Sequence, residues 1–356
     1  MKESIRIRIQ DCLIKTYDMM KHIYLFCMAC IISQSVSAQD IHWSQFEYAP
    51  LNLNAAHTGL FNGDYRIVGN YRSQWFDVPV SYRTVSLTFD AHLLPYQLEH
   101  DVWGFGVTFN HDQAGDGQLS LLNVMLSTAY TKRITKHFFI GAGVQLGYNN
   151  RRYNLQKLTF NDQFNGDVYD PNLLSYDQTK FAGKTNINYF DINAGLNFRY
   201  QANNRTWINL GGGIFHLTEP KMSFLGVEGV LLPIRWNVMA NASIQVSQRV
   251  DLMPTVIYQR QLEAQEIVYG ASLRYHFNVN PGRETSGEIG IMHRWDDAII
   301  ARIGFAYQQW HVGLSYDINV SGFEAATQNN GGYELSVVYI WSKVPSLGAV
   351  KTCPIF

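Results

Sequence analysis

The chain has 356 residues, of which 46% are hydrophobic, 14% aromatic and only 16% charged, and its formal net charge is -1. Such a balanced charge supplies no basic surface for a nucleic acid, so we expect no nucleic-acid partner. The length alone would fit two soluble domains, but low charge with many Tyr, Phe and Gly residues favours one large all-β domain.

Residues 1–38 have the features of a cleaved signal peptide. Lys21 precedes an apolar run over residues 22–33, and small residues follow it up to position 38. The run is too short to cross a bilayer comfortably as a helix, and this order of basic, apolar and small residues is typical of a secretory signal. The part before Met19 is long for a basic region, so Met19 or Met20 is an alternative translation start. Three of the four cysteines lie in this segment, and we expect the remaining fold to have no disulfide.

Residues 39–63 show no regular hydrophobic period and are rich in aromatic residues and Asn. Aromatic side chains rarely remain solvated without a partner, so we expect this lead-in segment to pack in or against the periplasmic mouth of the following domain. It also supplies candidate partner-binding residues, namely Trp43, Phe46, Tyr48, Pro50, Asn52 and Asn54.

Alternating apolar and polar residues begin at position 64 and continue through a series of short runs. In one of them Trp103, Phe105, Val107 and Phe109 share one parity. Successive side chains of a strand point to opposite faces, so each run predicts a strand between an apolar and a polar environment. About fourteen strands can be counted up to residue 341, an even number as in bacterial outer-membrane barrels.

The final hairpin, residues 310–341, carries the clearest alternation. One parity of its first strand is wholly apolar, and the other parity carries no large apolar residue. The apolar parity comprises Trp310, Val312, Leu314, Tyr316, Ile318 and Val320. A band of this kind with aromatic residues near its ends is what a barrel strand shows to lipid. We therefore predict a transmembrane antiparallel β-barrel over residues 64–341, followed by a tail over residues 342–356.

The lengths of the connections support this interpretation. With the amino terminus in the periplasm, connections after odd-numbered strands face outward. The two longest gaps, residues 151–183 and 218–234, both fall on outward connections, whereas the inward ones are short. Short periplasmic turns and long external loops are typical of outer-membrane barrels.

Residues that could support catalysis or metal binding have simpler explanations. No Gly-x-Ser-x-Gly motif is present, and His111, Asp112 and Asp116 are interpreted as hairpin-turn residues. Residues 293–297 are likewise interpreted as a loop between strands. Residues 211–213 are three glycines without the Lys-Ser/Thr of a phosphate loop, and close backbone approach explains them better. We expect no catalytic residue, no metal site and no cofactor.

Charged residues on the inward parity leave two interpretations open. Asp191, Arg199, Arg274 and Asp317 could define a path for a solute through the barrel. They could equally form an internal network that closes the lumen, and this is favoured because buried charges normally occur in pairs.

Three stretches of the chain resemble the PorP/SprF family of the type IX secretion system. They are QDIHWSQFEYAPLNLNAAHTGLFNGDYR followed by NYRSQW near the start, GLSYDINVSGFEAATQNNGGYELSVVYIW in the final hairpin, and the terminal CPIF. They lie at both ends of the chain in the family's order, so the resemblance covers essentially the whole mature chain.

The resemblance implies an integral, multi-pass barrel of the outer membrane that is not an enzyme. It further implies partners, namely components of the type IX machinery and a secreted cargo such as a gliding adhesin, besides the lipid of the outer membrane. It brings no residue-level active site. The alternative function is a barrel transporter for a small or apolar solute, which would require an open, apolar lumen. A second alternative, an outer-membrane hydrolase, would require His, Ser and Asp residues gathered at the outer rim.

Overall fold

A computed structural model describes residues 40–74, 82–95, 97–98, 100–170, 172–173, 175–280, 283–322 and 327–342. The predicted signal peptide and almost all of the predicted tail fall outside the described residues. Within them, no helix is long and apolar enough to cross a membrane.

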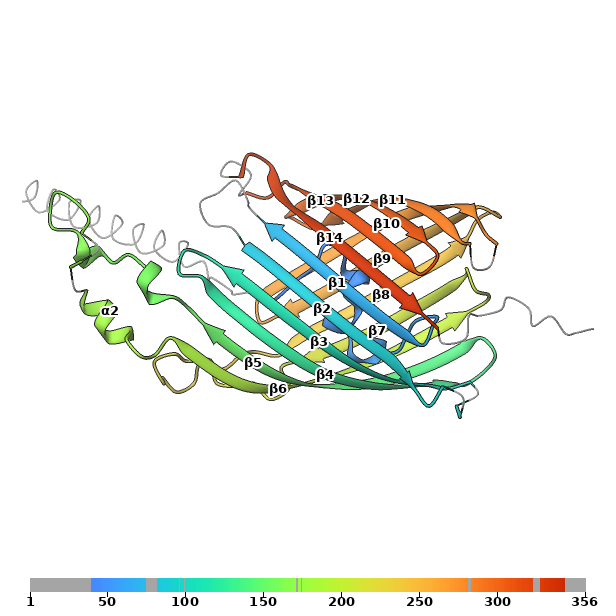
Figure 1. Cartoon of the computed structure of the whole chain (residues 1–356), viewed down its shortest axis with the longest axis horizontal. Coiled ribbons are helices and arrows are strands. Elements are labelled where there is room, and N and C mark those ends of the chain that lie inside the picture. The colour runs from blue at the N-terminus through green and yellow to red at the C-terminus, as the bar shows by residue number, and fades with distance from the viewer. Residues whose placement is uncertain are drawn as a thin grey trace, which may run out of the picture. The chain divides into compact units, whose positions relative to one another are not determined.

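Fourteen antiparallel strands in the described part of the chain form one closed barrel (Figure 1). They are β1 (Tyr65–Gln74), β2 (Tyr82–Leu93), β3 (Val102–Ala114), β4 (Leu119–Arg133), β5 (Phe138–Arg152), β6 (Asn186–Gln201), β7 (Trp207–Phe215), β8 (Arg235–Gln245), β9 (Val250–Gln261), β10 (Ala264–Asn278), β11 (Thr285–Arg294), β12 (Ala298–Tyr307), β13 (Trp310–Asn319) and β14 (Asn330–Trp341). Each strand pairs with its neighbour in sequence, and the prediction of an all-β antiparallel barrel is confirmed.

The barrel is closed by pairing of its first and last strands. The register of β1 on β14 runs without a break from Tyr65 opposite Trp341 to Gln74 opposite Gly332. Closure leaves no unpaired strand edge, and in a membrane every backbone polar group must find a partner inside the protein.

The predicted two-sided character of the strands is present in the structure. On β13, Leu314 is 47% exposed on the outer surface, whereas Asp317 is 3% exposed on the lumen side. All residues of β13 that are exposed on the outer surface are aliphatic or aromatic, as a lipid-facing surface requires. They are Trp310, Val312, Leu314, Tyr316 and Ile318. The lumen side carries amides, hydroxyls, charged groups and glycines.

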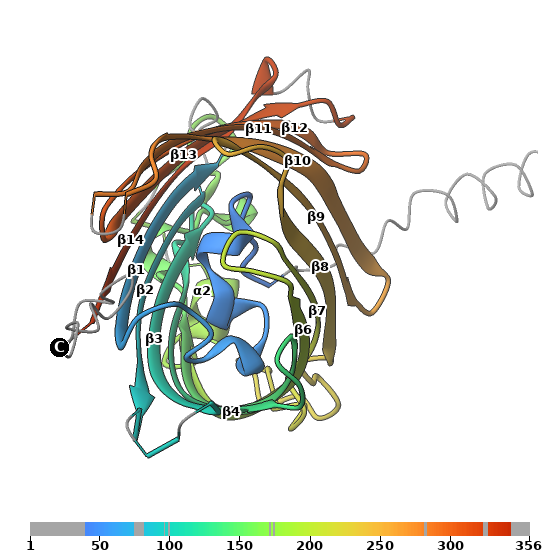
Figure 2. The same ribbon diagram turned by 90° about the vertical axis from the view of Figure 1, so that its right-hand side faces the viewer.

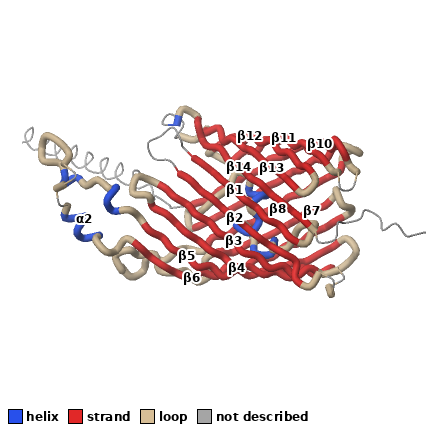
Figure 3. The backbone as a smooth tube through the Cα atoms, in the orientation of Figure 1, coloured by secondary structure: helices blue, strands red, loops and turns tan. Residues whose placement is uncertain are grey.

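The two longest connections between described strands leave the same end of the barrel. One, residues 153–185, joins β5 to β6 and contains η4 (Leu155–Lys157), η5 (Asn161–Gln163) and α2 (Tyr176–Phe181). The other, residues 216–234, joins β7 to β8. The first projects beyond the strands, with α2 at its far side (Figures 1 and 3). This end is the outer end by the usual asymmetry of these barrels, and the opposite end is the periplasmic one.

The lumen contains residues 40–63, which precede β1. Three short 3-10 helices, η1 (Phe46–Tyr48), η2 (Pro50–Asn52) and η3 (Ala55–His57), lie in this part. Figure 2, which looks in from the end of the short turns, shows this segment inside the ring of strands. We call residues 40–63 the lumen segment.

Candidate functional site

The lumen segment and the wall that receives it form the most elaborate polar site of the described structure. Trp43 is 1% exposed and Phe46 and Leu51 are fully buried, although none of them belongs to a strand. Burying large apolar side chains inside a barrel whose lumen side is mainly polar requires a matching wall.

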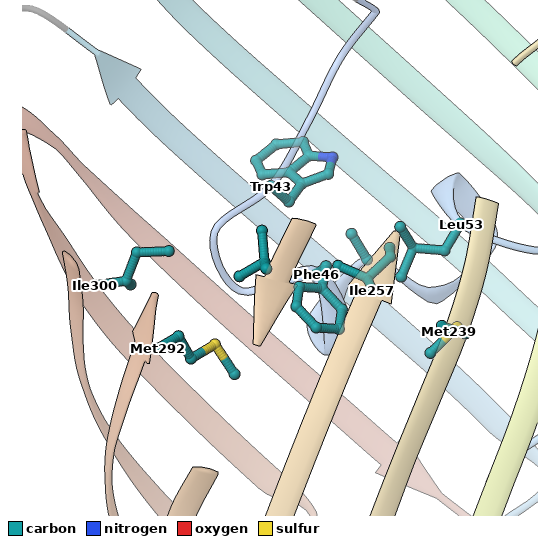
Figure 4. Packing of buried hydrophobic residues seen from close by; sticks show 9 residues of the cluster. Trp43, Phe46, Leu53, Met239, Ile257, Met292 and Ile300 are labelled. Atoms are coloured by element: carbon teal, nitrogen blue, oxygen red, sulfur yellow. The ribbon is translucent and has the colours of Figure 1, made fainter. Parts of the chain in front are cut away.

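An apolar strip on five consecutive strands receives the aromatic side chains of the segment. Trp43, Phe46 and Leu53 pack against it (Figure 4). Each of the strands β8 to β12 contributes one inward-facing apolar residue, and these are Met239, Ile257, Val268, Met292 and Ile300. Burial of a large apolar side chain contributes about 1.5–3 kcal/mol, so this strip is a substantial part of what holds the segment in the lumen.

Ser44 and Gln45 bind to charged residues in the outer half of the barrel. The backbone N–H groups of Ser44 and Gln45 donate to the two carboxylate oxygens of Glu334, at 2.8 and 3.0 Å. The hydroxyl of Ser44 donates to Asp317 at 2.7 Å and accepts from Arg294, also at 2.7 Å. Asp317 in turn pairs with Arg294 and, from β1, with Arg72, each at 3.1 Å. The buried charges of Asp317, Arg294 and Arg72 are tolerated here because each has an opposite partner and further hydrogen bonds. Glu334 is instead satisfied by the two backbone N–H groups.

The first described residue of the segment reaches the outer connections of the barrel. Asp40 accepts from His216 at 2.9 Å and pairs with Arg235 at 3.1 Å, and the other ring nitrogen of His216 lies 2.6 Å from Asp191. Burial disfavours the charged form of His216, but its two carboxylate neighbours outweigh this and raise its pKa to about 9. Burial acts against the Asp40 carboxylate too, yet Arg235 and His216 hold its pKa well below the ordinary value. Both groups are therefore charged at neutral pH.

A second charged chain crosses the lumen beside η1. Arg302 of β12 pairs with Glu47 of the segment and with Glu288 of β11. Glu288 also accepts from Arg274 of β10 at 3.1 Å. Of the four predicted inward charges, Asp191, Arg274 and Asp317 have charged partners, which supports the internal network over the open solute path. The fourth, Arg199, contacts only neutral groups among the described residues.

Wall amides bind the backbone carbonyls that the short helices leave unpaired. Gln145 donates to the carbonyl of Leu51 at 2.9 Å, and Asn237 donates to that of Leu53 at 3.1 Å. Asn54 caps η3 by accepting from the N–H of Ala56 and donates to the carbonyl of Leu196 in β6. A buried amide or carbonyl without a partner costs about 1–3 kcal/mol, so these contacts fix the segment at one position.

Glycines of the wall let the segment approach the strands closely. A Cβ atom at Gly143 would lie 2.5 Å from the carbonyl carbon of Ala55, and one at Gly213 would lie 2.5 Å from the carbonyl oxygen of Leu53. Real side chains do not come so close to a backbone, so any other residue would displace the segment. The interpretation of residues 211–213 as a site of close backbone approach is confirmed at Gly213.

At the periplasmic end the segment is held by Asp90. Its carboxylate accepts the N–H of Gly59 at 2.8 Å and binds Arg66 through two hydrogen bonds of 2.8 and 2.7 Å. The same guanidinium also donates to the carbonyl of His57. Gly59 has a φ of +75°, a conformation that favours glycine, where the chain turns toward β1.

The candidate partner-binding residues are all in the lumen segment. Trp43, Phe46, Pro50, Asn52 and Asn54 are buried there and Tyr48 is half-buried. The segment also extends farther than the periplasmic mouth, because Asp40 contacts His216 in an outer connection. A partner-binding role for the six residues stays a prediction, since in this conformation their contacts are with the barrel.

Two of the sequence interpretations need correction. His111 and Asp112 lie in β3 and not in the turn that follows, and Asp112 accepts a hydrogen bond from Thr84 of β2 at 2.6 Å. Similarly, His293 and Arg294 are the last residues of β11, and only the three residues after them form the turn. Both strands extend past their last lipid-facing residues because the lumen side continues to bind polar groups.

The residues that receive the segment were not predicted from the sequence. The five apolar strip residues occupy the inward parity, whereas the apolar stripes that predict the strands occupy the outward parity. An apolar residue recurring once per strand on the polar parity was the available signal. The acidic Glu334 and Glu288 gave no such signal, because a carboxylate on an inward parity fits a channel as well as a filled lumen.

Together, the closed wall, its lipid-facing surface and the filled lumen define an outer-membrane β-barrel protein. The sequence profile of the family described as type IX secretion system membrane protein PorP/SprF matches residues 35–339. The chain therefore belongs to the PorP/SprF family of the type IX secretion system and is located in the outer membrane.

Comparison with other known proteins gave distant similarities. No curated protein matches the chain. Among solved structures, the toluene transporter TbuX of Ralstonia pickettii is similar with a TM-score of 0.47 and 11% identity, covering 82% of this chain and 92% of that one. The toluene transporter TodX of Pseudomonas putida has a TM-score of 0.45 and 10% identity, covering 85% and 94%.

Proposed function

We propose that this protein assists the export or surface attachment of a specific secreted cargo, such as a gliding adhesin, and that it does so by binding and not by catalysis. The observation that supports this most is the filled lumen. A barrel of fourteen strands whose interior is occupied by its own chain leaves no route for another polypeptide through its centre. Its contribution to secretion then comes from surfaces at its two ends.

The outer connections are the surface we assign to cargo. The connection over residues 153–185 carries large apolar side chains that face solvent, including Phe164 at 55%, Val168 at 60% and Tyr176 at 77% exposure. Exposed apolar groups gathered on a connection beyond the membrane are typical of protein interaction sites. The short turns at the other end are assigned to the periplasmic components of the machinery.

For Trp43, Phe46, Tyr48, Pro50, Asn52 and Asn54 we propose contact with a partner only in a state in which the segment has left the lumen. The passive transporter is less well supported, since it requires an open, apolar lumen, and this one is mainly polar and occupied.

The proposal is tested by comparing surface proteins in cells with and without the gene. We expect one or a few exported proteins to be lost from the surface while the others remain. Replacing residues 160–180 by a short turn should cause the same loss, with normal insertion of the barrel, judged by heat-modifiable migration on gels. An unchanged set of surface proteins in both strains contradicts the proposal, and loss of uptake of a small apolar solute would favour the transporter.

A further inference from the structure

A cavity of about 350 Å³ lies between the lumen segment and the wall, toward the periplasmic end. The segment forms one side of it, with Phe46, Pro50 and Leu53 among the lining residues. The opposite side includes Trp207, the first residue of β7, and Met253 of β9. The volume is in the range of small-molecule sites. The lining combines apolar side chains with polar and charged ones, including four arginines.

The guanidinium groups that line the cavity outnumber the carboxylates that neutralise them. Three have acidic partners: Arg66 pairs with Asp90, Arg274 with Glu288, and Arg302 with Glu47 and the same Glu288. The fourth, Arg199 of β6, has no carboxylate within ion-pair distance among the described residues. His57, which also lines the cavity, adds no charge, because burial lowers its pKa to about 4. One positive charge is thus left over.

Neutral groups hold Arg199 in place without cancelling its charge. Its guanidinium carbon lies 4.7 Å from the centre of the Trp207 ring. Its Nε donates to the side-chain oxygen of Gln201 at 3.2 Å, and its Nη1 donates to that of Asn209 at 3.5 Å. Stacking on an indole and hydrogen bonds to amides orient an arginine fork and leave its remaining N–H groups able to bind an anion. Asn241, which lines the same cavity, has a buried Oδ1 atom without a hydrogen-bond partner in the described structure.

We propose that this cavity binds a small organic carboxylate with an apolar or aromatic body, and that Arg199 binds the carboxylate. An arginine fork matches a carboxylate through two parallel hydrogen bonds. The single excess charge fits a monoanion better than a doubly charged phosphate, and the side chains of Leu53, Met239 and Met253 provide contacts for the body. This inference is independent of the proposed role in secretion. Because the lumen segment forms one side of the cavity, the bound carboxylate also stabilises the segment in its place.

The proposal is tested on the whole barrel, purified in a non-ionic detergent. Binding of N-acetyl-L-phenylalanine is measured by calorimetry and compared with N-acetyl-L-phenylalaninamide, which has the same body without the charge. We expect the acid to bind at least about tenfold more tightly than the amide. A pentapeptide that ends in phenylalanine with a free carboxylate distinguishes two sources of the ligand. The pentapeptide binds if the site accepts the carboxyl end of a peptide, and it does not bind if only small free acids fit the cavity.

Substitution of Arg199 supplies the second arm. Arg199→Gln should reduce the affinity for the acid by about tenfold or more without changing that for the amide, and Arg199→Lys should retain part of the preference. Arg152→Gln, which removes a guanidinium at the outer end of β5, is the matched control and should bind like the unmodified protein. Heat-modifiable migration shows that each variant is folded. Equal binding of acid and amide, absence of binding by the acid, or an unchanged preference in Arg199→Gln would each overturn the proposal.

Discussion

The carboxylate of Glu334 in β14 accepts the backbone N–H of Ser44 at 2.8 Å, across 290 residues of sequence. The last strand of the barrel thereby binds the chain just before the first one. Since β14 also closes the wall by pairing with β1, the same strand completes the barrel and holds its contents.

Replacement of Glu334 by Gln tests this relationship. The amide places a donor against the N–H of Ser44 or Gln45, so one backbone donor loses its acceptor, which costs about 1–3 kcal/mol. We expect faster hydrogen exchange over residues 40–48 and little change in the exchange of the strands. Ser336→Ala, two residues along the same inward face, should leave the segment unchanged. Equal exchange of the segment in both variants would contradict this role of Glu334.

Two adjacent glycines of β7 provide a test of close approach. Gly213→Ala puts a methyl group 2.5 Å from the carbonyl oxygen of Leu53, and we expect a loss of about 1–3 kcal/mol as the segment is displaced. At Gly212, which faces outward, the nearest atom to an added Cβ is 3.8 Å away, and Gly212→Ala should change stability by less than about 0.5 kcal/mol. Thermal unfolding followed by heat-modifiable migration measures the difference, and similar losses in the two variants would exclude a steric origin.

The pairing of Asp40 with His216 predicts a pH dependence of segment docking. The pKa of His216 is raised from 6.5 to about 9, so its stabilisation is complete below pH 6.5 and is lost as the pH rises toward 9. The pKa of Asp40 is lowered, so its stabilisation is present above its ordinary value of 3.8 and is lost as the pH falls through the lowered pKa.

We therefore expect protection factors of residues 41–43 in hydrogen exchange to be greatest between about pH 4 and 6.5. In His216→Gln the fall between pH 6.5 and 9 should disappear. A fall of the same size in that variant would assign the effect to another group.

A charge on the lipid-facing stripe should destabilise the barrel. Leu314, in the middle of β13, is 47% exposed on the outer surface, and Leu314→Arg should cost about 2–4 kcal/mol in a bilayer. Gln248→Arg, in the exposed turn between β8 and β9, should cost less than about 0.5 kcal/mol. Refolding into lipid vesicles at increasing urea concentration measures both, and equal midpoints would contradict the assignment of this face to lipid.

The aromatic residues of the lumen segment provide a test in cells. Trp43→Ala, Phe46→Ala and Tyr48→Ala together remove side chains that we propose contact a partner when the segment has left the lumen, and we expect cargo display to be abolished while the barrel still inserts. Surface labelling measures display, and heat-modifiable migration measures insertion. The outward substitution Val238→Ala, next to the strip residue Met239, is the control. Normal display with the triple variant would remove these residues from the function.

The sequence by itself determined the wall of the barrel. Alternation with a period of two is a local property of each strand, and an apolar stripe such as Trp310 to Val320 can face only lipid when the other parity carries Ser315, Asp317 and Asn319. The strand number and the placement of both long connections at one end followed from the same pattern.

Only the tertiary structure decided where residues 40–63 lie. These residues have no period of their own, and their partners are spread over strands far apart in sequence: Asp90 on β2, Gly213 on β7, Arg294 on β11 and Glu334 on β14. Closure of the sheet brings these strands around one lumen, and only then do their inward groups face the same segment. From the sequence alone, an inward-facing Met239 or Glu334 is equally compatible with an open pore. A site made of long-range contacts exists only once the wall is closed, so only the closed barrel shows that these residues face the segment.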